Sequence, residues 1–196
     1  MILLKTRDVV TRTNSWLTEK TLHYGASSLY VPAGESIKKI LASWNKEPNP
    51  ALSFLTLYQV DDIIEGPGKN VFQRFFSATL PNWKVHPPIE CVQADLGILG
   101  LGTNGHVAFH EPGIPNSFRF GEVVLHEDTV WRLDVPLGTK GRTYGIAAFM
   151  DTDALLLIVR GYGKKKILKR MLKGDTSLPA TALLKHRDLT VLIAQN

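Results

Sequence analysis

Cysteine is almost absent from this sequence of 196 residues, because Cys91 is the only one. A single cysteine excludes an internal disulfide and fits a reducing compartment. Long apolar runs are missing as well. No stretch reaches the roughly 20 residues that a membrane-spanning helix needs, and the apolar start of MILLKTRDVV is too short for a signal peptide. The sequence therefore predicts a cytoplasmic protein without a membrane partner.

A strong charge of one sign is also lacking. The net charge of +5 suits an anionic substrate but does not demand nucleic acid. The sequence has no strip of basic and aromatic residues and no helix-turn-helix or zinc-finger spacing, so we expect no nucleic-acid partner. Hydrophobic residues make up 44% of the chain, which is enough for a sizeable core, and we expect one domain over residues 1–196.

Short apolar runs rich in Val, Ile and Leu alternate along the chain with amphipathic segments. The runs predict buried parallel strands and the amphipathic segments predict helices. Their alternation predicts an open, mostly parallel, Rossmann-like α/β sheet with helices on both faces. We expect strands at residues 28–31, 52–58, 95–101, 154–160 and 189–194, helices at 8–20, 36–44, 69–79 and 164–173, and extended pieces joined by turns within 120–148.

The most informative segment is LGILGLGTNGHVAFHEPG at residues 96–113. An apolar run ends there in a turn with three glycines, among them Gly102; His106 follows, and Glu111 comes five residues later. Glycines allow the backbone to approach a ligand closely, and an imidazole beside a carboxylate can act as an acid–base pair. The alternative is a strand and a tight turn whose polar residues only cap the next element. The coincidence of these residue types at one strand end favours a site.

A second predicted strand end, VPAGES at residues 31–36, leads through a glycine turn into a helix. Ligands of open α/β sheets lie outside the carboxyl ends of the strands. The backbone N–H groups around Gly34, together with the hydroxyl of Ser36, can therefore bind a phosphate at the helix start. The alternative is an ordinary helix cap.

Further charged residues follow the other strands. Asp61 and Asp62 form a carboxylate pair in which one member can be a general base, its pKa tuned by the other; the alternative is a solvated acidic turn. Lys164 follows a glycine turn and opposes the dipole of its helix, which a bound anion would offset; the alternative is a solvated basic face. Arg119 and Arg132 lie where either could reach a phosphate or a sugar hydroxyl, or be ordinary surface residues.

The segment GLGTNGHVAFHEPG resembles the signature of the glucosamine-6-phosphate deaminases, within a wider family that includes 6-phosphogluconolactonase. The lactonase version of the loop typically lacks the Phe-x-Glu-Pro ending present at residues 109–112. VPAGES is similar to the family's phosphate loop, VDD falls where the family has an Asp-Glu pair, and GYGKKKIL falls where it has a phosphate-binding lysine. The resemblance covers residues 29–173 and implies a shortened member.

The resemblance implies a reaction in which an amino-sugar phosphate becomes a ketose phosphate and ammonia is released. His106 would help open the sugar ring, and Glu111 and Asn104 would orient the imidazole of His106. Asp61 would carry a proton between C2 and C1 of the sugar. No metal or organic cofactor is implied, and a homo-oligomer is compatible with the resemblance. The phosphate would be bound by Gly34, Ser36, Lys164 and Arg132, and the rest of the substrate by Asp62, Gly102 and Arg119.

Three alternatives stay open. The first is a lactonase or plain isomerase on the same scaffold, because a histidine–glutamate pair also suits activation of water. The second is a sugar-phosphate-binding protein without turnover. The third is a metal site, since His106 and His110 are four residues apart and would share one face of a helix, although no third ligand is obvious.

Overall fold

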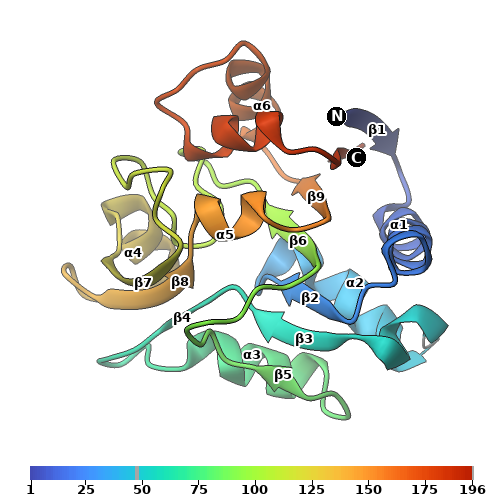
Figure 1. The fold of residues 1–196 in the computed structure, drawn as a ribbon. Helices are drawn as coiled ribbons and strands as arrows, with labels where there is room; N and C mark the ends of the chain where they lie inside the picture. Colours follow the sequence, from blue (N-terminus) through green and yellow to red (C-terminus); the bar gives the residue numbers. More distant parts are fainter. Residues whose placement is uncertain (47–48, 196) are drawn as a thin grey trace.

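The computed structural model describes residues 1–46 and 49–195, which form a seven-stranded parallel sheet with helices on both faces (Figure 1). The strand order is β1-β10-β9-β6-β2-β3-β5. The predicted parallel α/β architecture is therefore confirmed. The strands are β1 (Ile2–Thr6), β2 (Ser28–Val31), β3 (Thr56–Gln59), β5 (Val85–His86), β6 (Leu96–Gly100), β9 (Ala154–Val159) and β10 (Leu189–Ala194).

The helices form the two outer layers of the molecule. One layer packs on the sheet through a core of twenty buried residues and comprises α1 (Val9–Tyr24), α2 (Glu35–Lys46) and α3 (Val71–Thr79), together with the 3-10 helix η1 (Pro50–Phe54). The other layer comprises α5 (Ile146–Met150), α6 (Lys164–Leu172) and the 3-10 helix η2 (Pro179–Lys185).

Strand β9 shows how the apolar runs build both cores. All six of its residues are buried. Leu156 and Ile158 face the first core, whereas Leu155 and Leu157 face the second. Because successive side chains of a strand point to opposite faces, a strand covered on both sides is apolar at every position. This accounts for the unbroken run ALLLIV in the sequence.

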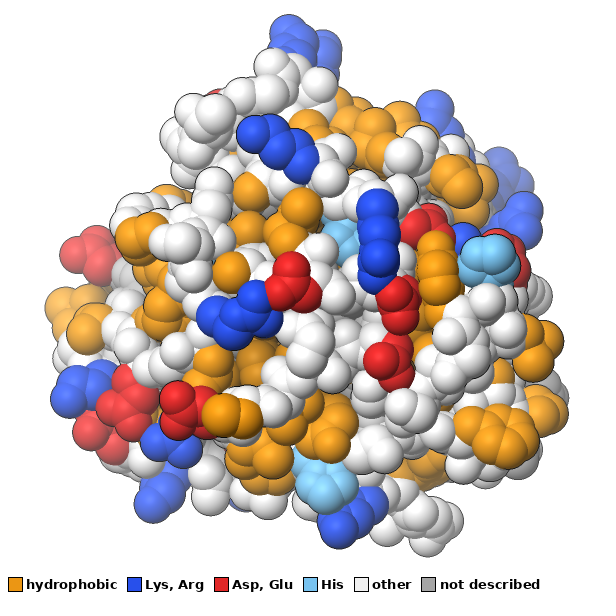
Figure 2. Space-filling view, in the orientation of Figure 1, with side chains coloured by type: hydrophobic (Ala, Val, Ile, Leu, Met, Phe, Trp, Pro, Cys, Tyr) orange, Lys and Arg blue, Asp and Glu red, His pale blue; other side chains and the backbone are white. Residues whose placement is uncertain are grey.

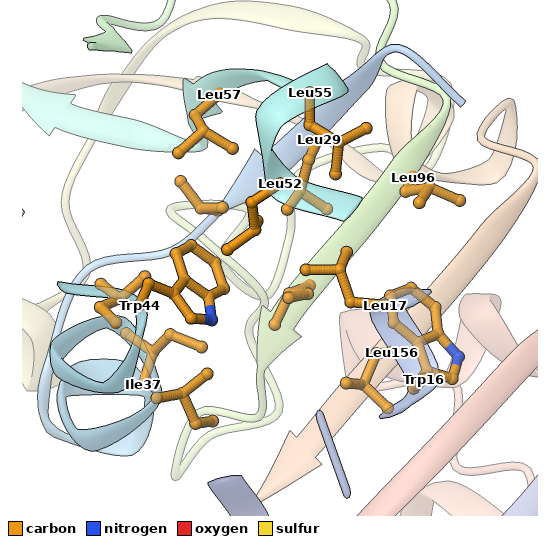
Figure 3. Close-up of a cluster of buried hydrophobic side chains, with 14 of the residues drawn as sticks. Trp16, Leu17, Leu29, Ile37, Trp44, Leu52, Leu55, Leu57, Leu96 and Leu156 are labelled. Carbon is orange, nitrogen blue, oxygen red and sulfur yellow. The ribbon is translucent and has the colours of Figure 1, made fainter. Parts of the chain in front are cut away.

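Trp44 is almost fully buried in the first core and lies between the sheet and the neighbouring helices (Figure 3). Its indole nitrogen donates a hydrogen bond of 2.8 Å to Asn14 Oδ1 on α1. Trp44 therefore contributes apolar burial and also ties α2 to α1.

A small antiparallel sheet of order β4-β8-β7 follows the region predicted to be extended. It contains β4 (Asp61–Ile63), β7 (Phe120–Val124) and β8 (Lys140–Tyr144). Within residues 120–148 the prediction is wrong at two places, because α4 (Glu127–Leu133) and the start of α5 are helical. His126 caps α4 by accepting a hydrogen bond from the Asp128 N–H, and two acidic residues occupy its first turn, which favours a helix there.

Two other predictions differ from the structure. The strand predicted at residues 52–58 begins only at Thr56, because Pro50 and the Asn49 cap on the Ala51 N–H start a 3-10 helix instead. The edge strand β1 was not predicted. The helix predicted at residues 8–20 is confirmed with the Asp8 cap and continues to Tyr24, before Gly25 in the left-handed conformation.

The order of strands places a switch point between β2 and β6. The chain leaves β2 toward β3 on one side, and it leaves β6 toward β9 on the other. The loops that follow these two neighbouring strands therefore diverge and leave a crevice at their carboxyl ends.

The surface carries charges of both signs. On the face shown in Figure 2, basic side chains lie both in the middle of the face and around its rim, interspersed with acidic ones. Over residues 1–46 and 49–195, no helix combines the length and apolar character that crossing a membrane requires.

Trp44→Ala is expected to lower the free energy of unfolding by about 3–5 kcal/mol, because it leaves a cavity in the first core. Trp44→Phe keeps most of the packing and loses the bond to Asn14, so a smaller loss of about 1–2 kcal/mol is expected. Urea unfolding followed by far-ultraviolet circular dichroism measures both values. Equal losses for the two variants would contradict the role assigned to packing.

Candidate active site

A cavity of 360 Å³ lies at the switch point between β2 and β6. Its walls come from the loops after β2 and β6, from the small sheet, and from the N-terminal ends of α2 and α6. The structure thus brings together most of the residues predicted from separate strand ends. The polar lining includes Gly34, Glu35, Ser36, Asp61, Gly102, His106, Thr129, Arg132 and Lys164, and the apolar lining includes Phe72, Phe109 and Leu133.

The glycine-rich loop after β6 packs the imidazole of His106 against the backbone of the loop at Gly102. The Gly102 N–H donates to the His106 carbonyl over 2.9 Å, and a Cβ at Gly102 would lie 2.4 Å from the Nε2 atom of the imidazole. Gly105 has a φ of +85°, and a Cβ there would lie 2.7 Å from Leu178. Only glycine fits these two positions without displacing a neighbour, which explains the glycine pattern of the segment.

The carboxylate of Glu111 is buried and surrounded by hydrogen-bond donors. Its Oε2 lies 3.1 Å from His106 Nδ1 and accepts a bond of 2.9 Å from Asn104 Nδ2, and its Oε1 accepts a bond from the Thr129 hydroxyl. Burial acts to raise the pKa of Glu111, but the bonds from His106, Thr129 and Asn104 outweigh it and lower the pKa to about 2. Glu111 is therefore ionised at neutral pH and orients the imidazole through Nδ1.

Asp61 lies on β4 and lines the cavity opposite the sheet. Burial, followed by the nearby carboxylates of Asp62 and Glu111, raises its pKa well above the ordinary value. Among the described residues, none donates a hydrogen bond to the Asp61 carboxylate. A carboxyl group whose ionised form is disfavoured in this way takes up a proton readily, as a general base must.

Cationic and N–H groups gather at the other end of the cavity. Lys164 Nζ lies 3.5 Å from Ser36 Oγ, and burial together with the charge of Arg132 lowers the pKa of Lys164. Gly34 has a φ of +107° and precedes the first turn of α2, where N–H groups lack partners within the helix. The Glu35 side chain is 88% exposed and pairs with Lys38, so its carboxylate does not enter this end.

Asp62 and Arg119 lie outside the cavity. Asp62 accepts hydrogen bonds from the backbone N–H groups of Ile63, Phe72 and Gln73, and from the side-chain amide of Gln59, so it anchors β4 to the start of α3. Arg119 pairs with Asp151 and donates to Gln93 over 2.9 Å on a different surface. The structure thus gives both side chains protein partners rather than a place beside the cavity.

His110 is placed differently from His106. Its Nδ1 accepts a bond of 3.1 Å from the Ile146 N–H, and its Nε2 donates to the Ile114 carbonyl over 3.1 Å. Both ring nitrogens are therefore used inside the protein, and neither is available to a metal shared with His106. Among the described residues, no group of three or more His, Cys, Asp or Glu could hold a metal ion.

Sequence reasoning missed Thr129, which lines the cavity and binds Glu111. It also missed Thr143, whose hydroxyl accepts a bond of 3.2 Å from the Phe109 N–H and so holds the glycine-rich segment against β8. Threonines are common, and nothing in their local pattern marks these two. Only the packing of α4 and β8 on the loop reveals them.

Comparison with known proteins agrees with this geometry. No family model matches the chain. Over 107 residues it is 33% identical to the glucosamine-6-phosphate deaminase of Listeria monocytogenes serotype 4b, covering 50% of this chain and 46% of the relative. Over 111 residues it is 37% identical to that of Lactobacillus delbrueckii subsp. bulgaricus, covering 52% and 47%. Over these stretches the chain is similar to the glucosamine-6-phosphate deaminases. Its match spans about half the length of these curated relatives.

Solved structures share the fold of this chain along its whole length. A monomeric glucosamine-6-phosphate deaminase superposes with a TM-score of 0.77 at 20% identity, covering 100% of this chain and 98% of the other. The 6-phosphogluconolactonase of Thermotoga maritima superposes with a TM-score of 0.74 at 17% identity, covering 100% and 99%. The resemblance predicted from the signature loop is confirmed.

Gly102→Ala is expected to displace the imidazole of His106 and to lower the melting temperature by several degrees, about the effect of 1–3 kcal/mol of overpacking. Gly100→Ala is the matched control, since a Cβ there meets no atom within 4 Å. Differential scanning calorimetry compares the two variants with the wild type. A Gly102→Ala protein as stable as the control would contradict the close approach of ring and backbone.

Asp61→Asn is expected to stabilise the protein at neutral pH. Because the pKa of Asp61 is higher in the folded than in the unfolded chain, the wild type loses stability as the pH rises from the unfolded value toward the folded one. Asparagine carries no such cost, so the variant should have a higher melting temperature than the wild type at pH 7. The difference should shrink as the pH falls toward 4, and a lower melting temperature at pH 7 would overturn the raised pKa.

Proposed function

We propose that this protein converts an amino-hexose 6-phosphate into a ketose 6-phosphate and releases ammonia, as the names of its relatives suggest. The observation that carries the proposal is the convergence of Asp61, His106 and Lys164 on one cavity from three distant parts of the chain. The match to the curated deaminases supports it over half their length.

The cationic end of the cavity is the proposed phosphate site. Lys164, Ser36 and the N–H groups after Gly34 line it together, and Arg132 lies on its rim with a bond of 3.0 Å to Thr103 Oγ1. A phosphate dianion placed there meets two cationic side chains and the positive end of α2. The charge repulsion between Lys164 and Arg132 in the free protein is relieved when the anion binds.

The acid–base groups act on the sugar at the other end. In the proposal, His106 moves a proton to the ring oxygen as the ring opens, while Glu111 balances the imidazolium charge. Asp61 then takes the proton from C2 while the substrate's ammonium group gives a proton to the aldehyde oxygen, leaving an enolamine, and Asp61 returns its proton to C1. This transfer gives an imine at C2, which water hydrolyses to the ketone with loss of ammonia. The raised pKa of Asp61 suits a group that must accept and return one proton.

Asp62, Asn104 and Gly102 have supporting roles in this proposal. Asp62 holds the strand that carries Asp61, through its bonds to the first turn of α3. Asn104 holds the Glu111 carboxylate and also accepts a bond of 3.1 Å from the His106 N–H. Gly102 leaves room for the imidazole. That the protein is cytoplasmic and that it forms a homo-oligomer both remain predictions.

The test measures ammonia and ketose phosphate after the purified chain is incubated with glucosamine 6-phosphate. Release of both is expected, and His106→Ala or Asp61→Asn should lower kcat by about 10²–10⁴-fold, the contribution of a general acid–base group. Glu122→Gln is the matched control, because this exposed carboxylate on β7 pairs with Arg142 outside the cavity. Wild-type protein that yields neither product would refute the proposed reaction.

A 6-phosphogluconolactonase is the second candidate, because lactonases share the fold and the His106–Glu111 pair could also activate water. A parallel assay with 6-phosphogluconolactone separates the two candidates: hydrolysis without ammonia release would favour the lactonase. A hexitol 6-phosphate that raises the melting temperature without turnover of either substrate would instead indicate a binding protein.

A further inference from the structure

Among the described residues, Thr129 is the one hydrogen-bond donor to the Glu111 carboxylate that lies outside the glycine-rich segment. Asn104 and His106, the other two donors to this carboxylate, lie within seven residues of Glu111. Thr129 lies on α4, eighteen residues further along the chain. Because an ionised carboxylate only accepts hydrogen bonds, the Thr129 hydroxyl is the donor in this pair.

The position of Thr129 is set by packing and not by the site. The residue is buried, and its neighbour Val130 belongs to a small core with Phe109, Leu125 and Ile63. This core lies between α4 and the small sheet. The packing of α4 on this core therefore fixes the position of the Thr129 hydroxyl beside Glu111.

The orientation of a glutamate carboxylate depends on such donors. The last torsion of the side chain has a broad energy profile, so the rotamer alone does not decide which way the two oxygens face. Thr129 holds Oε1, which leaves Oε2 facing Asn104 and the Nδ1 atom of His106. Without the hydroxyl, Oε1 would be a buried charged atom lacking its donor, and the carboxylate would rotate or take up a proton.

We propose that Thr129 is a positioning residue for the acid–base pair: its hydroxyl orients the Glu111 carboxylate so that Nδ1 of His106 donates to it and Nε2 is left for the substrate. The consequence for the sugar reaction rests on the proposed function, whereas the effect on the imidazole does not. Thr129 lies three residues before Arg132 on the same helix, so α4 serves both ends of the cavity.

The first arm of the test needs no substrate. NMR of the imidazole nitrogens in the wild type is expected to show His106 with the proton on Nδ1 when the ring is neutral. Thr129→Val keeps the shape but removes the hydroxyl, and it should give a mixture of the two tautomers. The pKa of Glu111, followed by carbon NMR, should rise from about 2 toward its ordinary value. Thr129→Ser should restore the Nδ1-protonated tautomer of His106 and the low pKa of Glu111.

The second arm measures turnover. If the chain deaminates glucosamine 6-phosphate, Thr129→Val should lower kcat by about tenfold and change KM by less than about twofold, because the hydroxyl acts through Glu111 and not on bound substrate. Thr139→Val is the matched control, since that buried hydroxyl donates to the Pro136 carbonyl away from the cavity.

The outcomes separate the two proposals. A wild-type tautomer in Thr129→Val, or a Thr129→Ser protein as altered as Thr129→Val, would overturn the positioning role. A mixture of tautomers in a chain that shows no turnover would support the positioning role while refuting the proposed reaction. A tenfold loss of kcat in Thr129→Val with an unchanged tautomer would also overturn the positioning role.

Discussion

The burial of one ionised carboxylate, that of Glu111, is the constraint on which the site depends. A charge removed from water is tolerated only where hydrogen bonds replace its hydration. Three donors do so here, and they come from the glycine-rich segment and from α4. The segment must therefore turn tightly enough to bring Asn104 and His106 back onto Glu111, and α4 must pack against it. The glycines, the small core under α4 and the position of the imidazole all follow from satisfying this one group.

The surroundings of Glu111 and Asp61 shift the pKa values of these two carboxyl groups in opposite directions. Glu111 has three donors and stays ionised. Asp61 is buried near two other carboxylates and has no donor among the residues that the structure describes, which favours its protonated form. Two carboxyl groups held in different states can take different roles in proton transfer. Glu111 is suited to orienting and balancing a charge, and Asp61 to moving a proton. The difference arises from hydrogen bonding and not from residue type.

The sequence predicted those parts of the fold and site that depend on local pattern. The apolar run of β9, the Asp8 cap of α1 and the glycines around His106 each reflect a local requirement, and the strand ends lie where parallel topology brings them together. Residues 127–133 were misread because seven residues of mixed polarity show no clear period, and α4 is stabilised by capping and packing. The partners of Asp62 and Arg119 were hidden because they belong to elements distant in sequence.

The cationic end of the cavity shows a similar balance between stability and binding. Lys164 is partly buried, near the positive end of its own helix and near Arg132, and both burial and the arginine lower its pKa. Such an arrangement disfavours the free protein, because like charges repel and one of them lacks full hydration. An anionic group in the cavity reverses each of these effects at once. The strand order places this cationic end beside the acid–base pair, since the loops after β2, β6 and β9 all open at the same edge. Under the proposed function, binding energy at a phosphate in this end would help to hold the sugar against His106 and Asp61.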